Sequence, residues 1–297
     1  MDYEHELPSD QDPDERTSGQ PTSVNYSNQV IASSSNPERS VDWAAAPEAE
    51  PVYRAWGAGA GISVWLISVA LTLLIPLLVV LGWVAFRAVR APLTDQAVQE
   101  LLQSRSASVL LVSATFPAHV AIVVICWAVA TRMGRVPFRT AIGWNWANRR
   151  PLYWLGLSVL LVFALEIVAY LLPQFIPEKQ GGSFEEMLNK GLAVRVAVAI
   201  VATISAPFAE EFVYRGLLFS GLAYSFGKSA AIALVTLIFT GVHVFQYYGH
   251  WASITALAIL SLILTLMRDR TGAILPCIVL HLINNAVQSV GVLISRG

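Results

Sequence analysis

The chain has 297 residues, is 55% hydrophobic and only 13% charged, and has a mean hydropathy of +0.58. This composition excludes an ordinary soluble globular protein and indicates a membrane protein with several spans. The net charge of −1 combines an acidic beginning, in which positions 1–50 hold eleven acidic residues against Arg16 and Arg39, with a basic remainder. The two cysteines, Cys126 and Cys277, lie in apolar runs and indicate neither a disulfide framework nor a cysteine metal site.

Residues 1–50 are expected to form a disordered acidic tail. They are rich in Ser, Pro, Asp and Glu and poor in aliphatic residues, so they cannot bury enough apolar surface to offset the entropy of ordering. No cleaved signal peptide is expected, because the first long apolar run begins near Gly57, too late and too long for one. The chain is therefore divided into this tail, an N-terminal transmembrane region over 51–190, and a C-terminal transmembrane core over 191–297.

The apolar runs after the tail predict an all-α fold with about seven to eight transmembrane helices. About 20 residues are needed to cross roughly 30 Å of hydrocarbon. Candidate spans lie at 57–86, 107–131, 152–176, 192–225, 229–247, 251–267 and 272–294. The fourth run carries Pro207 near its middle, and the missing backbone N–H of proline predicts either a kinked helix or two separate segments. Residues 91–104 and 178–190 are expected to be short interfacial pieces.

The distribution of arginine predicts which turns share a side of the membrane. The loop at 132–150 carries five arginines and no acidic residue, so we place it in the cytoplasm. Alternation of the spans then puts the turn at Lys228 and the turn containing Arg268 and Arg270 on the same side. The same count places the N-terminus inside and the C-terminus outside.

Three charged residues inside the fourth run require an explanation. A charge near the centre of a bilayer costs roughly 2.5–3.5 kcal/mol on insertion scales, so Glu210, Glu211 and Arg215 need partners or a function. Residues four apart share a helix face, which predicts an ion pair between Glu211 and Arg215. Glu210 is rotated by about 100° and is left to point elsewhere.

Other polar residues of the core are predicted to reach the same depth as Glu210. Glu210 and His243 are almost equally far in sequence from the turn at Gly227, roughly 25 Å at about 1.5 Å per residue. His281 and Asn285 lie roughly 16 and 22 Å beyond the turn at Arg270, so an ordinary tilt brings them level with the first two. A carboxylate, two imidazoles and an amide are thus expected to converge.

This set of groups has the chemistry of amide-bond hydrolysis. A carboxylate and a histidine can position and deprotonate a water or hold a metal that does so, and a second histidine with an amide can stabilise an oxyanion. Two further intramembrane groups carry weaker predictions. His119 has no evident partner and is interpreted as structural, whereas Glu166 either pairs with Arg195 or lines a polar cavity.

Three motifs in order resemble one known family. They are Glu-Glu-x-x-x-Arg at 210–215, Phe-x-x-x-His with Phe239 and His243, and His-x-x-x-Asn with His281 and Asn285. Together with the flanking stretches at 206–209 and 270–276, they resemble the CPBP or Abi family, which comprises type II CAAX prenyl proteases and bacterial proteins linked to bacteriocin processing and self-immunity. The resemblance covers about residues 200–290, and the combination is specific where any one motif alone is weak.

The resemblance implies an intramembrane endopeptidase, a hydrolase acting near a membrane-embedded or prenylated C-terminal segment of its substrate. Glu210 would activate the water, His243 would hold the water or a metal, and His281 with Asn285 would form the oxyanion site, supported by the residues Glu211, Arg215 and Phe239. The family is described both as metalloproteases and as metal-independent glutamate proteases, so zinc or another divalent metal on Glu210, His243 and His281 stays open.

The expected partners are the lipid bilayer and a membrane protein or prenylated peptide, with no nucleic acid, because no basic and aromatic nucleic-acid surface is evident. The expected location is an integral membrane one, which for a bacterial chain is the plasma membrane. Two rival functions remain at this point. The first is a proton-coupled transporter, which requires a polar path to both faces, and the second is a catalytically silent immunity or scaffold protein.

Overall fold

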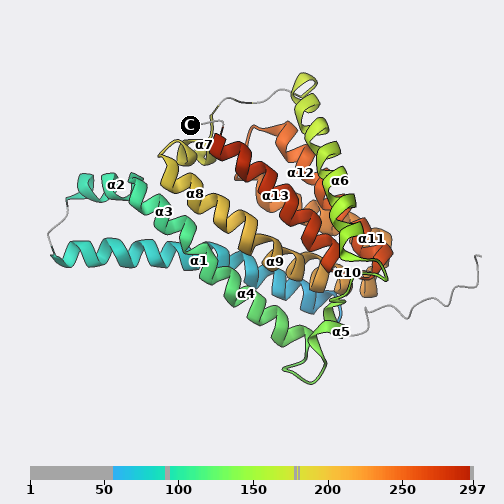
Figure 1. Ribbon diagram of the computed structural model, residues 1–297. Coiled ribbons are helices and arrows are strands. Elements are labelled where there is room, and N and C mark those ends of the chain that lie inside the picture. Colours follow the sequence, from blue (N-terminus) through green and yellow to red (C-terminus); the bar gives the residue numbers. More distant parts are fainter. Residues whose placement is uncertain (1–55, 91–93, 177–178, 180, 295–297) are drawn as a thin grey trace, which may run out of the picture. The chain divides into compact units, whose positions relative to one another are not determined.

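The computed structural model describes residues 56–90, 94–176, 179 and 181–294, all of which belong to one unit over Ala49–Gly297. The tail predicted over 1–50 lies outside the described residues. The described part is built from helices and contains no β-strand, so the predicted all-α fold is confirmed (Figure 1).

Six helical segments of the described chain are long and apolar enough to cross a membrane. They are α1 (Ala58–Arg90), the pair α3 and α4 (Arg105–Ser113 and Thr115–Ala130), α6 (Pro151–Leu171) with its 3₁₀ extension η3 (Leu172–Gln174), the run from α8 to α10 (Leu192–Phe226), α12 (Trp251–Thr271) and α13 (Leu275–Ile294). The remaining apolar run, predicted at 229–247, forms α11 (Lys228–Val244), whose 17 residues cover only about 25 Å. The chain is therefore an integral membrane protein with several spans.

Shorter helices connect these segments. α2 (Asp95–Gln103) and α7 (Ser183–Leu188) fall in the two stretches expected to be short connecting pieces, and α5 (Phe138–Ile142) lies in the arginine-bearing loop. α2 begins where the sequence supplies a cap, because the Thr94 hydroxyl accepts a hydrogen bond from the Ala97 N–H at 3.3 Å.

The fourth span is one continuous helix that absorbs Pro207 by changing its winding. It consists of α8 (Leu192–Ile200), the π-helical segment η4 (Val201–Ser205), α9 (Ala206–Glu211), the π-helical segment η5 (Phe212–Leu218) and α10 (Phe219–Phe226). Pro207 stands at the start of α9, directly after a wide π turn, where its missing N–H is tolerated. Of the two predictions for this run, the single distorted helix is correct.

Three turns that carry basic residues meet at one end of the helices, which we call the arginine-rich end (the turns at 131–150, 226–228 and 268–274). Lys228 Nζ lies 3.5 Å from Asp269 Oδ1, and the Ile274 N–H donates to the Gly143 carbonyl at 2.9 Å. Gly143 has a φ of +68°, and a Cβ there would collide with the Gly272 carbonyl oxygen, so only glycine fits this contact. The predicted grouping of these turns on one side is confirmed.

The opposite end is formed by the connections near α2, α7 and the start of α12. The Lys179 N–H donates to the Gly249 carbonyl at 2.9 Å, and the Arg105 Nε donates to the Lys190 carbonyl at 2.8 Å. α13 runs from the arginine-rich end to this end and packs against α6 on one side and α8 on the other (Figure 1).

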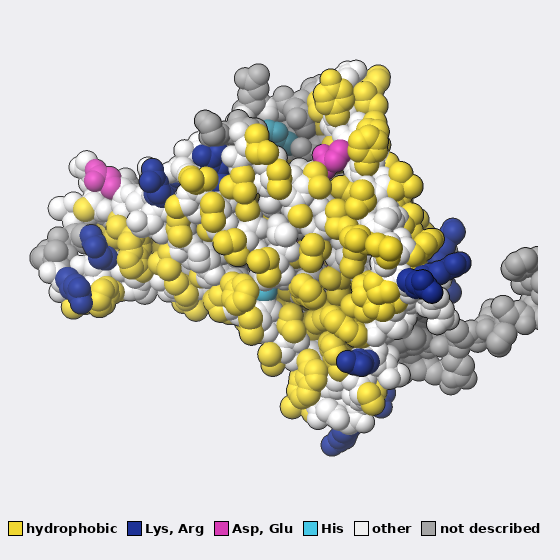
Figure 2. Space-filling model, viewed as in Figure 1, with side chains coloured by type: hydrophobic (Ala, Val, Ile, Leu, Met, Phe, Trp, Pro, Cys, Tyr) yellow, Lys and Arg dark blue, Asp and Glu magenta, His cyan; other side chains and the backbone are white. Residues whose placement is uncertain are grey.

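The outer surface agrees with a lipid environment. Figure 2 shows hydrophobic side chains over most of the face in view, with Lys and Arg side chains gathered toward its edges. Large exposed apolar residues are common on α1 and α6, among them Leu73 at 66%, Leu78 at 63% and Phe163 at 64% exposure. Such surface is stable against acyl chains and costly in water.

Candidate active site

A cavity of about 520 Å³ lies among the helices and collects all four residues predicted to be catalytic. Glu210 from α9, His243 from α11, and His281 and Asn285 from α13 are all on its wall, together with Phe239. The depth argument from the sequence therefore placed these side chains correctly around one space.

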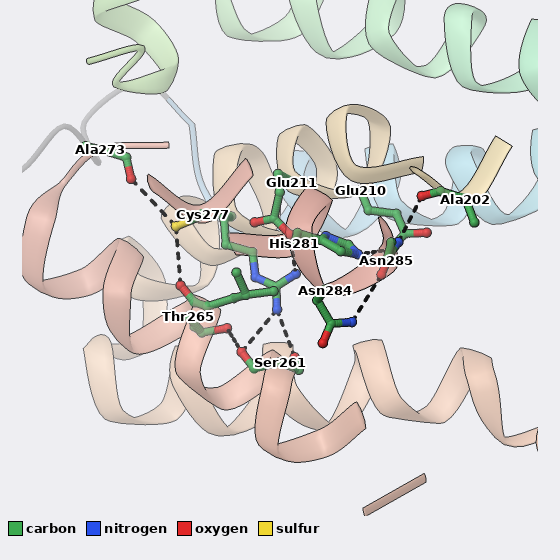
Figure 3. A network of polar contacts seen from close by, with 12 residues as sticks. Ala202, Glu210, Glu211, Ser261, Thr265, Ala273, Cys277, His281, Asn284 and Asn285 are labelled. Carbon is green, nitrogen blue, oxygen red and sulfur yellow. Dashed lines mark hydrogen bonds and ion pairs between the residues drawn. The ribbon is translucent and has the colours of Figure 1, made fainter. Parts of the chain in front are cut away.

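His281 lies between the two adjacent carboxylates of the fourth span (Figure 3). Its Nδ1 is 2.8 Å from Glu211 Oε1 and its Nε2 is 3.7 Å from Glu210 Oε2. Because a carboxylate in an ion pair only accepts hydrogen bonds, Nδ1 carries the proton of that shorter contact. Glu211 thereby fixes the imidazole with Nε2 directed toward Glu210 and the cavity.

Glu211 belongs to a fully buried ion-pair network. Its Oε1 accepts a hydrogen bond from Arg215 Nη1 at 3.0 Å, and both side chains have 0% exposure, so the predicted pair is present. The Nη2 of Arg215 donates to both the carbonyl and the hydroxyl of Ser261 on α12, each at 3.0 Å. The guanidinium also lies 4.8 Å above the ring centre of Phe239. Three helices are thus tied together by one cation.

His243 is oriented by its own helix. Its Nδ1 is 2.8 Å from the Phe239 carbonyl one turn earlier, and since a carbonyl only accepts, Nδ1 carries the proton. The other nitrogen, Nε2, is left as an acceptor on the cavity side. The Phe239 ring supports this arrangement, with its centroid 4.8 Å from the His243 ring and 6.2 Å from the His281 ring.

Asn285 is held by the winding defect in the fourth span. In η4 the Ala206 N–H bonds to the carbonyl of Val201 five residues back, so the next donor of that pattern would be residue 207, which is proline. The Ala202 carbonyl instead accepts from Asn285 Nδ2 at 2.9 Å. Pro207 and the π turn therefore provide the contact that positions Asn285.

Glu166 lies on the cavity wall and does not pair with Arg195, which was one of its two predicted environments. Its Oε1 accepts a hydrogen bond from Gln288 Nε2 at 2.6 Å, and the structure has no Glu166–Arg195 ion pair. Arg195 is buried but does not line the cavity. The pairing prediction was wrong, because a sequence places two residues at one depth without fixing the directions in which their helices turn them. The other prediction, a polar cavity wall, is correct.

His119 also has a partner that the sequence did not reveal. Its Nδ1 lies 2.9 Å from the hydroxyl of Ser205, 86 positions away in the chain, and the side chain is buried on the cavity wall. Asn284 is a second missed residue, whose amide donates to Asn285 Oδ1 at 3.3 Å. Its position next to Asn285 in an apolar helix was the available signal.

The cavity extends toward one end of the molecule only. Its wall continues past the four residues predicted to be catalytic to Gln246 and Tyr247 after α11, Ser253 at the start of α12 and Val292 near the end of α13. None of the described lining residues belongs to the arginine-rich end. Burial raises the pKa of Tyr247 and the charge of Glu210 raises it further, which keeps its hydroxyl protonated as a hydrogen-bond donor at the mouth.

The shortness of α11 explains why a mouth can exist there. A helix of 17 residues falls about 5 Å short of a 30 Å hydrocarbon layer. His243 lies in its last turn, so the chain leaves the helix beside the histidine instead of continuing along it. The cavity wall at this level is formed by residues after α11, together with Phe184 and Met187 of α7 and Val292 of α13.

The described residues do not present a ready metal site. No group of three or more His, Cys, Asp or Glu side chains within the described ranges is arranged to hold an ion. His281 and His243 each hold Nδ1 in a hydrogen bond within the protein and keep Nε2 for another partner. The three predicted metal ligands, Glu210, His243 and His281, all line one cavity, and a metal on them stays a prediction.

Comparison with known proteins finds one family model that matches the helices carrying the site. Residues 192–287 match the family model described as type II CAAX prenyl endopeptidase Rce1-like, which confirms the resemblance predicted from the motifs. The match runs from α8 into α13 and includes all four predicted catalytic residues. Searches of curated proteins and of solved structures gave no match for the chain.

Proposed function

With residues 192–287 taken as a domain of the type II CAAX prenyl endopeptidase kind, we propose that Glu210 activates a water for peptide-bond hydrolysis inside the membrane. The substrate is a peptide segment near a membrane-embedded or prenylated C-terminus. The observation that carries the proposal is the 3.7 Å approach of His281 Nε2 to Glu210 Oε2 on the wall of a cavity that His243 and Asn285 also line.

The chain's own groups can supply each proton transfer of such a reaction. Glu210 takes a proton from a water held against His243 Nε2, and the water oxygen attacks the carbonyl carbon of the scissile bond. Protonated His281, stabilised through Nδ1 by Glu211, donates from Nε2 to the oxyanion, and the free N–H of the Asn285 amide donates to it as well. The protonated Glu210 then delivers its proton to the leaving amine as the C–N bond breaks.

The form of the cavity favours a peptidase over a transporter. A proton-coupled transporter requires a polar path that reaches both membrane faces. The wall of this cavity stops above the buried network of Glu211, Arg215 and Ser261, and its described lining residues are absent from the arginine-rich end. A space closed on one side can receive a peptide segment but does not connect two compartments.

Reconstitution into liposomes tests the proposal against a catalytically silent protein. The wild type, Glu210→Gln and the control Glu100→Gln would be incubated with a farnesylated peptide and with a panel of transmembrane peptides, and products would be identified by mass spectrometry. Glu100 is exposed on α2 and does not line the cavity, so its variant removes an acidic charge elsewhere. We expect cleavage by the wild type and the control, and a loss of about 10²–10⁴-fold in Glu210→Gln.

Two results would contradict the proposal. Equal cleavage by the wild type and Glu210→Gln would remove Glu210 from the reaction, and no cleavage of any peptide by the wild type would favour the silent protein. A parallel reaction with a chelator addresses the metal. Activity that persists in the chelator agrees with the absence of a ligand set, whereas activity that is lost and restored by zinc would assign a metal role to the same residues.

A further inference from the structure

Apart from its histidines, the cavity is lined by charged groups of one sign only among the described residues. The lining contains Glu210 and Glu166 as titratable carboxylates, and the described lining includes no lysine and no arginine. Arg215 is nearby but is directed away from the cavity, where Glu211 and Ser261 occupy it. The catalytic scheme uses Glu210 and leaves Glu166 without a function.

Glu166 is held in place but not neutralised. Gln288 donates one hydrogen bond to Oε1 at 2.6 Å, while Oε2 has no hydrogen-bond or ion-pair partner among the described residues. The residue lies on α6 between Leu165 and Ile167, in a helix whose outer face carries exposed apolar side chains. Glu166 is half-buried in a helix apolar enough to span a membrane, where a carboxylate is costly unless a cation joins it.

We propose that Glu166 is a specificity residue that receives a lysine or arginine side chain of the peptide substrate. The proposal rests on the proposed peptidase function and names the class of peptide that this site accepts. A basic side chain in the cavity would reach Oε2 and form a charge-assisted hydrogen bond, while Gln288 keeps the carboxylate oriented. A free C-terminal carboxylate at this position would be repelled.

The spacing of α13 fixes where in the substrate this residue must lie. Gln288 follows His281 by seven residues, which corresponds to about 10 Å along the helix axis. An extended peptide advances about 3.3 Å per residue. The basic residue is therefore expected about three residues from the scissile bond, on the side of the bond that faces the cavity mouth.

The test compares peptides that differ only at this position. Peptides with lysine, norleucine or glutamate three residues from the scissile bond, on either side of it, would be cleaved by the wild type, Glu166→Gln, Glu166→Lys and the control Glu100→Gln. For the wild type and the control, we expect kcat/KM for lysine to exceed that for norleucine about tenfold. The ratio should fall to about one in Glu166→Gln, and Glu166→Lys should prefer glutamate.

A binding measurement keeps this proposal separate from the peptidase function. Fluorescent forms of the lysine and norleucine peptides would be titrated onto detergent-solubilised Glu210→Gln and onto the double variant Glu210→Gln/Glu166→Gln. Tighter binding of the lysine peptide that disappears in the double variant supports the specificity role even if no peptide is cleaved. The same lysine preference with and without Glu166, or no lysine preference in Glu210→Gln, would overturn it.

Discussion

The neighbouring residues Glu210 and Glu211 belong to two regions that differ in how an intramembrane charge is stabilised. Glu211 is fully buried, and its oxygen accepts from both Arg215 and His281, so its charge is matched by contacts within the protein. Glu210 faces the cavity, where its one ion contact is the 3.7 Å approach of His281. Sequence proximity therefore says little about role, whereas the contacts that each carboxylate makes separate a structural charge from one available for chemistry.

The same contrast extends to the basic residues. Arg215 and Arg268 are fully buried near the arginine-rich end, and both donate hydrogen bonds to backbone carbonyls there or on α12. The cavity, in contrast, has a mainly apolar wall whose polar groups include carboxylates, histidines and amides but no lysine or arginine among the described residues. One half of the molecule uses charge to fix its helices, and the other keeps hydrogen-bonding capacity for a substrate.

The largest effect on stability is expected from breaking the buried network. Arg215→Met removes the permanent cation beside the buried Glu211 and leaves it only the contact with His281, and the loss of one partner of a buried ion pair costs about 3–5 kcal/mol. The free energy of unfolding in mixed micelles would be measured for this variant and for the double variant Glu211→Gln/Arg215→Met. The glutamine can still accept the hydrogen bond from His281 Nδ1, so we expect the double variant to recover much of the loss.

The comparison with Glu210→Gln sharpens this prediction. Glu210→Gln should lose activity with little change in the free energy of unfolding. The Glu210 side chain faces the cavity and makes few contacts with other residues, so its replacement removes little that stabilises the fold. Two results would contradict a structural role of the Glu211–Arg215 ion pair. One is a midpoint of unfolding for Arg215→Met at the same denaturant concentration as for the wild type, and the other is a double variant no more stable than the single one.

Local geometry explains which parts of the site could be predicted from the sequence. The Glu211–Arg215 pair follows from the four-residue spacing of a helix, and the common depth of Glu210 and His243 follows from counting residues from a shared turn. The contact between His281 and Glu211 joins positions 70 residues apart and depends on the rotation of α13 against α9. That rotation is set by packing, as is the choice of Gln288 over Arg195 as the partner of Glu166.

The two ends of the molecule can be distinguished by chemical labelling. Cys126 and Cys277 both have 0% exposure, so an introduced cysteine provides the one accessible thiol of the described residues. The variants Arg135→Cys, at the arginine-rich end, and Ser253→Cys, at the cavity mouth, would be treated with a membrane-impermeant maleimide in right-side-out vesicles. The excess of arginine predicts that Arg135 lies in the cytoplasm, so we expect only Ser253→Cys to react before the membrane is permeabilised.

The opposite pattern would reverse the orientation and place the cavity mouth in the cytoplasm. Reaction of both variants from one side would contradict the arrangement of the two ends itself. Labelling of Ser253→Cys from outside would also mean that a substrate reaches Glu210 from the non-cytoplasmic face, which narrows the substrates to segments exposed there.

The smallest expected effect concerns the winding defect in the fourth span. Pro207→Ala restores a backbone N–H that can bond to the Ala202 carbonyl and so compete with Asn285 for it. One hydrogen bond contributes about 0.5–1.5 kcal/mol, so kcat should fall by roughly 2- to 12-fold. The unfolding free energy should stay the same or increase, because alanine is the better residue inside a helix.

Pro151→Ala is the matched control, because Pro151 is the first residue of α6, where a missing N–H costs nothing. It should leave kcat at the wild-type value. A kcat of Pro207→Ala equal to that of this control would mean that the Ala202 carbonyl does not position Asn285. A general loss of folding would lower activity and stability together. Lower activity with unchanged or higher stability would therefore show that the π turn and Pro207 act on the geometry of the site.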